Sequence, residues 1–170
     1  MSKKSVYLFL ALLLPVIVFV FLKYFGKNEF AIPVYYKDGI DSVSVSCGGD
    51  YARPYTVPDS VLTAINAAKK QARVVVFEPT EASKIELNRL TDIFRSEEFT
   101  KSEIIIQQGD PTGISESRYR RWTSCIFFVK KPYNAVLMDD QNRIRGYYAV
   151  GSREEMDRLI LEMQILLKKY

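Results

Sequence analysis

Residues 135–169 decide the fold, and they read AVLMDDQNRIRGYYAVGSREEMDRLILEMQILLKK. Two short apolar segments, 135–138 and 144–148, flank the polar residues 139–142. This pattern is typical of two antiparallel strands joined by a tight turn, because acidic and amide side chains favour turn conformations. The sequence therefore predicts a β-hairpin near the end of the chain.

An amphipathic helix is predicted directly after this hairpin. Ser152 and Glu155 have the spacing of a capping box, in which each side chain bonds to a free backbone N–H of the first turn. Apolar residues then recur at helical spacing on one side of the helix: Met156, Leu159, Ile160, Met163, Leu166 and Leu167.

Upstream of the hairpin, strand and helix patterns alternate. Residues 73–77 are typical of a buried strand, Thr80 is placed to cap a helix that buries Leu87, Leu90, Ile93 and Phe94, and residues 104–106 predict the next strand. Two further elements are expected, a short helix at 59–65 and a third strand at 125–129. The order of strand, helix, strand, hairpin and helix predicts an α/β fold of the thioredoxin-like sandwich type.

The beginning of the chain has an unbroken apolar run from Val6 to Leu22. A helix over this run covers about 25 Å, so with the next two aromatic residues it can span a hydrocarbon layer of roughly 30 Å. Lysines lie on both flanks: Lys3, Lys4, Lys23 and Lys27. The segment lacks the small-residue cleavage site of a signal peptide, which favours an uncleaved membrane anchor. The extra positive charge of the amino terminus favours an exported domain.

Three parts are expected: an anchor over 1–27, a tether over 28–58 with a short strand at 43–46, and one folded domain over 59–170. The chain has 24 basic and 20 acidic residues, but four lysines precede the first acid, Glu29, so the exported part has no net charge. Nucleic acid is therefore an unsuitable ligand, because its binding needs basic residues massed on the folded domain.

Five segments resemble the bacterial SCO/SenC family, and three of them form the C-terminal block: 136–139, 143–148 and 155–160. Residues 32–36 and 54–59 are similar to membrane-tethered members of that family. The resemblance implies a thioredoxin-like fold on the exported side of the bacterial cytoplasmic membrane. It also implies a role in delivering copper or managing thiols during assembly of cytochrome oxidase.

The residues that carry this family's chemistry are absent. The family binds copper through a C-x-x-x-C motif after the first core strand and a histidine before the hairpin, and such soft thiolate and imidazole ligands suit copper. Here residues 78–85 contain no cysteine, the histidine position falls near Lys131 or Pro132, and the chain has no histidine. We therefore expect no metal site, no cofactor and no catalytic residues. The acids Glu78, Glu81 and Glu86 are interpreted as helix-dipole partners.

Two cysteines, Cys47 and Cys125, could form a structural disulfide in an oxidising compartment or remain free. A basic and aromatic segment is the best candidate for a surface that contacts a protein partner or lipid headgroups, through guanidinium groups with added aromatic contact. It comprises Arg118, Tyr119, Arg120, Arg121, Trp122, Lys130 and Lys131. The alternative is an ordinary solvated loop.

The sequence thus predicts a protein of the bacterial cytoplasmic membrane with a single span and a periplasmic domain. We expect a binding or assembly module for another envelope or membrane protein, not an enzyme. The alternative is a copper-binding or thiol-redox protein that uses Cys47 and Cys125, with Met138 as a third soft ligand.

Overall fold

The computed structural model describes residues 3–25, 31–40, 47–48, 51–105 and 114–168. The chain divides into two compact units, Met1–Ala31 and Ile32–Tyr170. In the first unit, α1 (Lys3–Phe25) contains Pro15. Its side chains from Ala11 to Tyr24 are all exposed, and most of them are large and apolar. Within the described part of the chain, no helix is both long and apolar enough to qualify as a membrane span.

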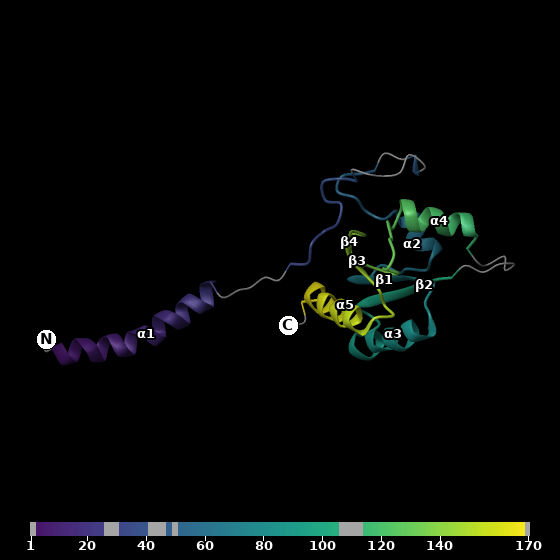
Figure 1. Cartoon of the computed structure of the whole chain (residues 1–170). Helices are drawn as coiled ribbons and strands as arrows, with labels where there is room; N and C mark the ends of the chain where they lie inside the picture. The colour runs from purple at the N-terminus through teal and green to yellow at the C-terminus, as the bar shows by residue number, and fades with distance from the viewer. Residues whose placement is uncertain (1–2, 26–30, 41–46, 49–50, 106–113, 169–170) are drawn as a thin grey trace. The chain divides into compact units, whose positions relative to one another are not determined.

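The second unit is built on a sheet with strands β1 (Ala72–Phe77), β2 (Phe99–Ile104), β3 (Ala135–Asp139) and β4 (Ile144–Tyr148). The strands lie in the order β2-β1-β3-β4 (Figure 1). β1 is parallel to β2, and β3 is antiparallel to both of its neighbours. The predicted hairpin is confirmed as β3 and β4, and the chain has a mixed α/β fold.

The parallel pair β1 and β2 is connected by α3 (Glu81–Ile93). As predicted, Thr80 caps this helix, and its hydroxyl accepts a hydrogen bond from the Ser83 N–H at 3.2 Å. Leu87 and Leu90 are buried, but Ile93 is exposed, contrary to expectation. Phe94 is buried because the chain leaves the helix there with extended backbone angles, which turn its side chain to the core.

One face of the sheet is covered by α3 and α5 (Arg153–Leu166), which contact each other (Figure 1). The predicted C-terminal helix is confirmed, with four of its apolar residues buried. Ser152 occupies the N-cap position without a side-chain cap hydrogen bond, so the predicted capping box does not form. The core on this face is mainly aliphatic: Ala72, Val74, Val76, Leu87, Leu90, Phe94, Phe99, Ala135, Leu137, Tyr148, Val150, Met156, Leu159, Ile160 and Met163.

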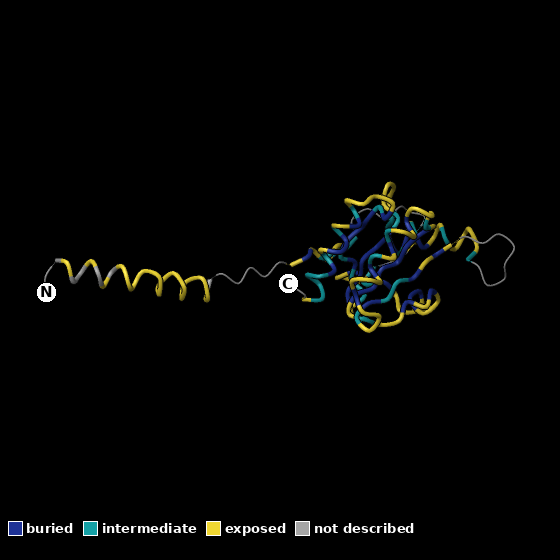
Figure 2. Tube along the Cα trace, turned by 90° about the horizontal axis from the view of Figure 1, so that it is seen from below, coloured by how far each residue is buried: buried dark blue, intermediate teal, exposed yellow. Residues whose placement is uncertain are grey.

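The opposite face carries the short helix α2 (Asp59–Ala64), α4 (Glu116–Cys125) and irregular segments (Figure 1). Its core is richer in aromatic side chains: Tyr55, Val57, Val61, Leu62, Ile65, Ala67, Val75, Phe77, Ile104, Trp122, Phe127, Val136, Met138, Ile144 and Tyr147. Figure 2 shows the buried residues gathered along the strands, with the exposed ones around them.

The boundary of the compact unit differs from the expected one. We expected a tether over 28–58, but the unit begins at Ile32. Ile32, Tyr55 and Val57 are buried, and the Val57 N–H donates to the Asn142 carbonyl at 2.9 Å. The many Pro and Gly residues of this segment suggested a tether, yet its apolar side chains complete the core. The expected strand at 43–46 lies outside the described residues.

Two strand predictions were wrong. Cys125 ends α4, and residues 126–129 form an irregular segment in which Phe128 has a φ of 52°. A short apolar run cannot distinguish a buried strand from other buried backbone. β2 ends at Ile104 instead of covering 104–106, and it begins at Phe99. β2 is an edge strand and only partly buried. Its sequence is therefore mostly polar and lacks the apolar run that predicts a buried strand.

Candidate functional site

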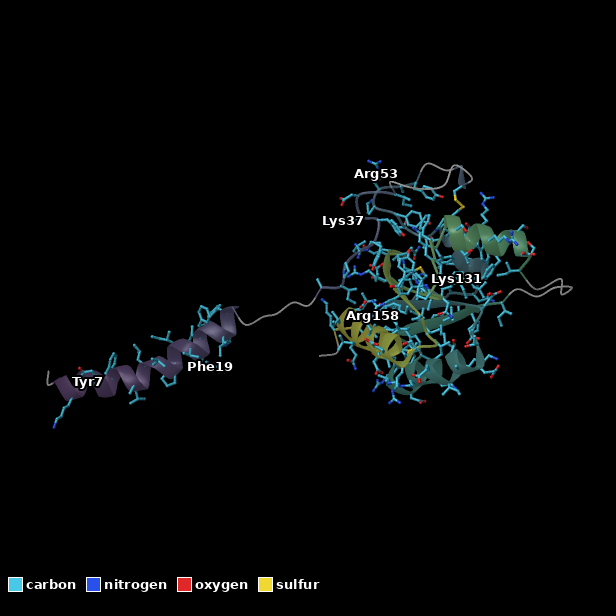
Figure 3. All side chains as sticks on the ribbon, in the orientation of Figure 1. Tyr7, Phe19, Lys37, Arg53, Lys131 and Arg158 are labelled. Carbon is cyan, nitrogen blue, oxygen red and sulfur yellow. A yellow bond between two sulfur atoms is a disulfide. The ribbon has the colours of Figure 1, made fainter. Side chains whose placement is uncertain are left out.

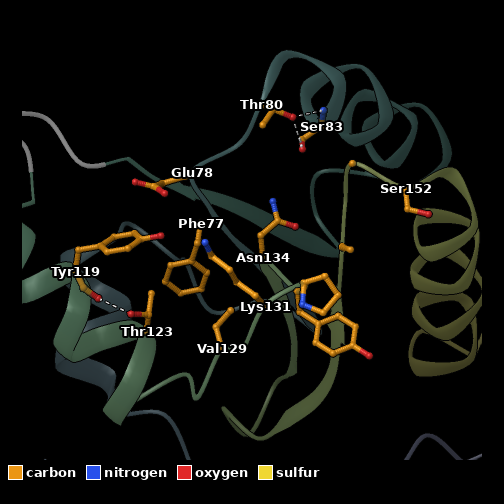
Figure 4. Close-up of a pocket in the computed structure, with 14 residues that line it drawn as sticks. Phe77, Glu78, Thr80, Ser83, Tyr119, Thr123, Val129, Lys131, Asn134 and Ser152 are labelled. Carbon is orange, nitrogen blue, oxygen red and sulfur yellow. Dashed lines mark hydrogen bonds between the residues drawn. The ribbon is translucent and has the colours of Figure 1, made fainter.

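An open cavity of about 920 Å³ lies at the carboxyl end of β1 (Figure 4). Four segments surround it: the turn from β1 into α3, one side of α4, the loop before β3, and the turn from β4 into α5. Its lining residues are Phe77, Glu78, Thr80, Ser83, Tyr119, Thr123, Val129, Lys131, Pro132, Tyr133, Asn134, Ala149, Gly151 and Ser152.

Two of these segments lie far apart in the sequence. The turn into α3 contributes Glu78, Thr80 and Ser83, and the loop before β3 contributes Lys131 and Asn134. The fold brings them together because β1 and β3 are neighbours in the sheet. The side chains at these positions are a carboxylate, hydroxyls, an ammonium and an amide, which are not the soft ligands that copper prefers. The Lys131–Pro132 peptide bond is cis.

Glu78 lines the cavity directly after β1. Its backbone has a φ of 47°, and its N–H donates to the Ile104 carbonyl at 2.9 Å, so it lies just past the end of the parallel pair. The Tyr119 hydroxyl on α4 lies within electrostatic reach of the Glu78 carboxylate. Burial, and secondly this carboxylate, raise the pKa of Tyr119 to about 12. Tyr119 therefore remains a neutral hydrogen-bond donor at physiological pH.

Hydrogen bonds fix three polar side chains of the cavity lining. The hydroxyls of Thr80 and Ser83 lie 2.9 Å apart, and the Asn134 Oδ1 accepts from the Val150 N–H at 3.0 Å. Lys131 differs from them, because its ammonium has no hydrogen-bond or ion-pair partner among the described residues. Figure 4 shows its side chain extending into the space beside Phe77 and Asn134.

The cavity combines charged and apolar groups. It offers one carboxylate, one unpaired ammonium and an apolar wall of Phe77, Val129 and Tyr133. In the part of the chain that the structure describes, no three His, Cys, Asp or Glu side chains are grouped to hold a metal ion.

Three tyrosines hold the loop that forms one wall of this cavity. The hydroxyls of Tyr51, Tyr55 and Tyr147 donate to three successive carbonyls, those of Cys125, Ile126 and Phe127, at 3.0, 2.8 and 2.8 Å. We call this arrangement the tyrosine clamp. The rings of Tyr51 and Tyr55 also contact Phe128, with centroids 5.7 and 5.2 Å apart. No sequence pattern predicts the clamp, and the only signal for it is the count of 11 tyrosines.

Cys47 and Cys125 form a disulfide bond, with their Cα atoms 5.5 Å apart (Figure 3). The bond joins the segment before Tyr51 to the last residue of α4, so it reinforces the tyrosine clamp. Neither cysteine lines the cavity. Of the two states that the sequence left open, the structure contains the disulfide.

The seven residues of the basic segment do not form one surface. Tyr119 and Lys131 line the cavity, whereas Arg118, Arg121 and Trp122 line a separate groove between α2 and α4. Arg120 forms an ion pair with Glu116, and Lys130 is exposed in the loop outside both hollows. Trp122 is buried instead of offering its ring to a partner. A helix explains this division, because successive residues point in directions about 100° apart.

No family model matches the chain, and no curated protein matches it.

Proposed function

We propose that the chain is a membrane-anchored, SCO/SenC-like domain of thioredoxin-like fold that binds an envelope protein through its cavity and performs no copper or redox chemistry. The proposal rests on two segments that line one cavity and that correspond, by the resemblance, to the metal-binding segments of the SCO/SenC family. Residues 78–83 and 131–134 lie far apart in sequence, yet they line the same hollow. A binding role is what remains for such a site when its soft ligands are replaced by Glu78, Thr80 and Lys131.

The strand order and directions support the thioredoxin-like assignment. A β-α-β unit with parallel β1 and β2 is followed by an antiparallel hairpin whose first strand lies beside β1. Helices α3 and α5 cover one face, and α2 and α4 cover the other (Figure 1). This is the arrangement that the resemblance implies.

The residues give the copper or thiol alternative little support. Cys47 and Cys125 are joined in a disulfide that lies outside the cavity lining. Met138, the proposed third soft ligand, is fully buried on β3 in the core. A site made of these residues would need the disulfide to be reduced and the core to open.

The proposed location rests on α1 and on the disulfide. The lysines on both flanks of the apolar run from Val6 to Leu22 can extend their ammonium groups to the membrane interface, which would help this short run to anchor the chain. Its exposed apolar side chains need a cover, which a bilayer would supply. A disulfide is typical of an oxidising compartment, which agrees with a single-pass protein of the bacterial cytoplasmic membrane whose domain faces the periplasm.

Site-specific photocrosslinking in native membranes tests the binding role. A photoreactive residue replaces Tyr133, which is 39% exposed on the cavity wall, and the control replaces Leu161, which is 58% exposed on α5. We expect one discrete protein adduct from position 133 and none from position 161.

Lys131→Glu should abolish the adduct, whereas Lys130→Glu, one residue outside the cavity, should preserve it. Equal adducts from both positions, or an adduct that survives Lys131→Glu, would contradict the proposal.

A further inference from the structure

A second hollow, the α2–α4 groove, has a volume of about 610 Å³. Its lining residues are Pro58, Ser60, Val61, Ser115, Ser117, Arg118, Arg121, Trp122 and Ile126. Tyr119 and Thr123 on the same helix line the cavity instead. The two hollows share no lining residue, so the groove is independent of the proposed function.

The charge of the groove has one sign. Two arginines line it, and its lining contains no acidic residue. Arg118 and Arg121 form neither an ion pair nor a hydrogen bond with any described residue. Arg120, on the other side of the helix, does have an acidic partner, because Glu116 lies one turn before it. The unpaired guanidinium groups of α4 are therefore the two that face the groove.

The remaining polar groups of the groove are hydroxyls. The oxygens of Ser115 and Ser117 lie 3.3 Å apart, so one of the two hydroxyls can donate to the other while the second remains free to donate elsewhere. Ser60 contributes a third hydroxyl from α2. Ser115 is also the N-cap residue of α4 but makes no side-chain cap hydrogen bond. The groove thus contains many hydrogen-bond donors above an apolar floor of Val61, Trp122 and Ile126.

We propose that the α2–α4 groove binds a phosphate group. Arg118 and Arg121 are three residues apart on a helix, where side chains are neighbours, so both guanidinium groups can bond to one anion. A guanidinium matches the spacing of phosphate oxygens and can bond to two of them at once. A tetrahedral phosphate has enough oxygens for two arginines and the serine hydroxyls, whereas a carboxylate has only two. The phosphate belongs either to a soluble phosphomonoester or to an anionic lipid headgroup.

Trp122 provides the readout, because it is the only tryptophan of the chain and lines the groove. The full chain in a neutral detergent is titrated with inorganic phosphate, and potassium chloride of equal ionic strength serves as the control. A second titration adds micelles that contain phosphatidic acid, with diacylglycerol of the same chains as its control. We expect a saturable change in Trp122 emission with phosphate, with phosphatidic acid, or with both. The two titrations distinguish a soluble from a lipid source.

The arginines are tested by the Arg118→Ala/Arg121→Ala double variant, which should weaken phosphate binding about tenfold or more, as expected for lost charge-assisted bonds. Arg120→Ala removes one charge from the same helix and should leave binding within about twofold, since Arg120 already has Glu116 as its partner. Circular dichroism checks that all variants are folded. The proposal is overturned if neither phosphate source changes the emission, or if the double variant binds phosphate like the native chain.

Discussion

The two faces of the sheet are built in different ways. The face under α3 and α5 is closed by two regular helices that pack mainly aliphatic side chains on the strands. The other face is closed by two shorter helices, the tyrosine clamp and a disulfide. The cavity opens at one end of the sheet, where both faces contribute to its lining, and the groove belongs to the second face alone. The regular face is the more uniform of the two, and the irregular face carries the groove and contributes α4 to the cavity lining.

The largest expected effect that separates the two faces is alkaline unfolding. Burial raises the pKa of Tyr55, Tyr119, Tyr147 and Tyr148 above the ordinary value of 10.0, with the pKa of Tyr119 at about 12. Below pH 10 these tyrosines are protonated in both the folded and the unfolded state, so they do not make the free energy of unfolding depend on pH. Above pH 10 the unfolded chain loses protons that the folded chain keeps, so stability falls as the pH rises through 12.

We therefore expect cooperative unfolding above pH 10, with these tyrosines ionising only as the protein unfolds. Absorbance at 295 nm follows tyrosine ionisation, and circular dichroism follows the fold. Three of the four tyrosines pack on the irregular face, which should open first in hydrogen exchange. Ionisation of all 11 tyrosines with a midpoint near 10, while the protein remains folded, would contradict the burial on which the comparison rests.

Removal of the disulfide should have the next largest effect. Cys47→Ser with Cys125→Ser opens a loop of 78 residues, which the loop-entropy model converts to about 4 kcal/mol of lost stability. Urea unfolding measures this loss, and a dithiol reductant should reproduce it in the native chain but not in the double variant. Hydrogen exchange should increase at 126–134 and remain unchanged in α5. A loss below about 1 kcal/mol would show that the tyrosine clamp holds this segment without the disulfide.

Truncating a core side chain under the regular face should lower the stability of the fold without affecting the crosslink to the partner protein. Leu159 lies on the buried side of α5 and is fully buried, so Leu159→Ala should cost about 3 kcal/mol in urea unfolding. Leu161→Ala on the exposed side of the same helix should change stability by less than about 0.5 kcal/mol. Both variants should keep the crosslink from position 133. Loss of that crosslink in folded Leu159→Ala would show that the two faces are not separable.

The smallest expected loss of stability comes from the N-cap residues of α3 and α5, which both line the cavity. Thr80 accepts a hydrogen bond from the Ser83 N–H, whereas Ser152 makes no side-chain cap hydrogen bond. Thr80→Ala should therefore cost about 1 kcal/mol, and Ser152→Ala should cost close to nothing. Equal losses in urea unfolding would mean that Ser152 forms its capping box in solution.

Sequence periodicity predicted the regular face well and the irregular face poorly. The hairpin and α5 have clear strand and helix periods, and the cap at Thr80 is a local signal. The apolar run at 125–129 has no distinguishing period, so the end of α4 and its following loop were taken for a strand. The tyrosine clamp joins residues that are 74, 71 and 20 positions apart, and such hydroxyl-to-carbonyl bonds leave no pattern in the sequence.

The candidate site was predictable only in part. The resemblance marks the segments around Glu78 and Lys131 only as positions without metal ligands, and Glu78 was interpreted as a helix-dipole partner. The structure instead places Glu78 before α3, in one cavity with Tyr119 and Asn134. The basic segment was treated as one surface because its register on a helix was unknown. Once α4 is in place, Tyr119 and the two unpaired arginines point to different hollows.

Copper binding by the full chain tests the central claim most directly. The chain is purified from membranes with its disulfide intact and titrated anaerobically with Cu(I) against a competing chelator. The account predicts that the chain retains no stoichiometric copper and behaves like the Cys47→Ser/Cys125→Ser variant. Retention of one copper ion per chain, lost in that variant, would contradict it.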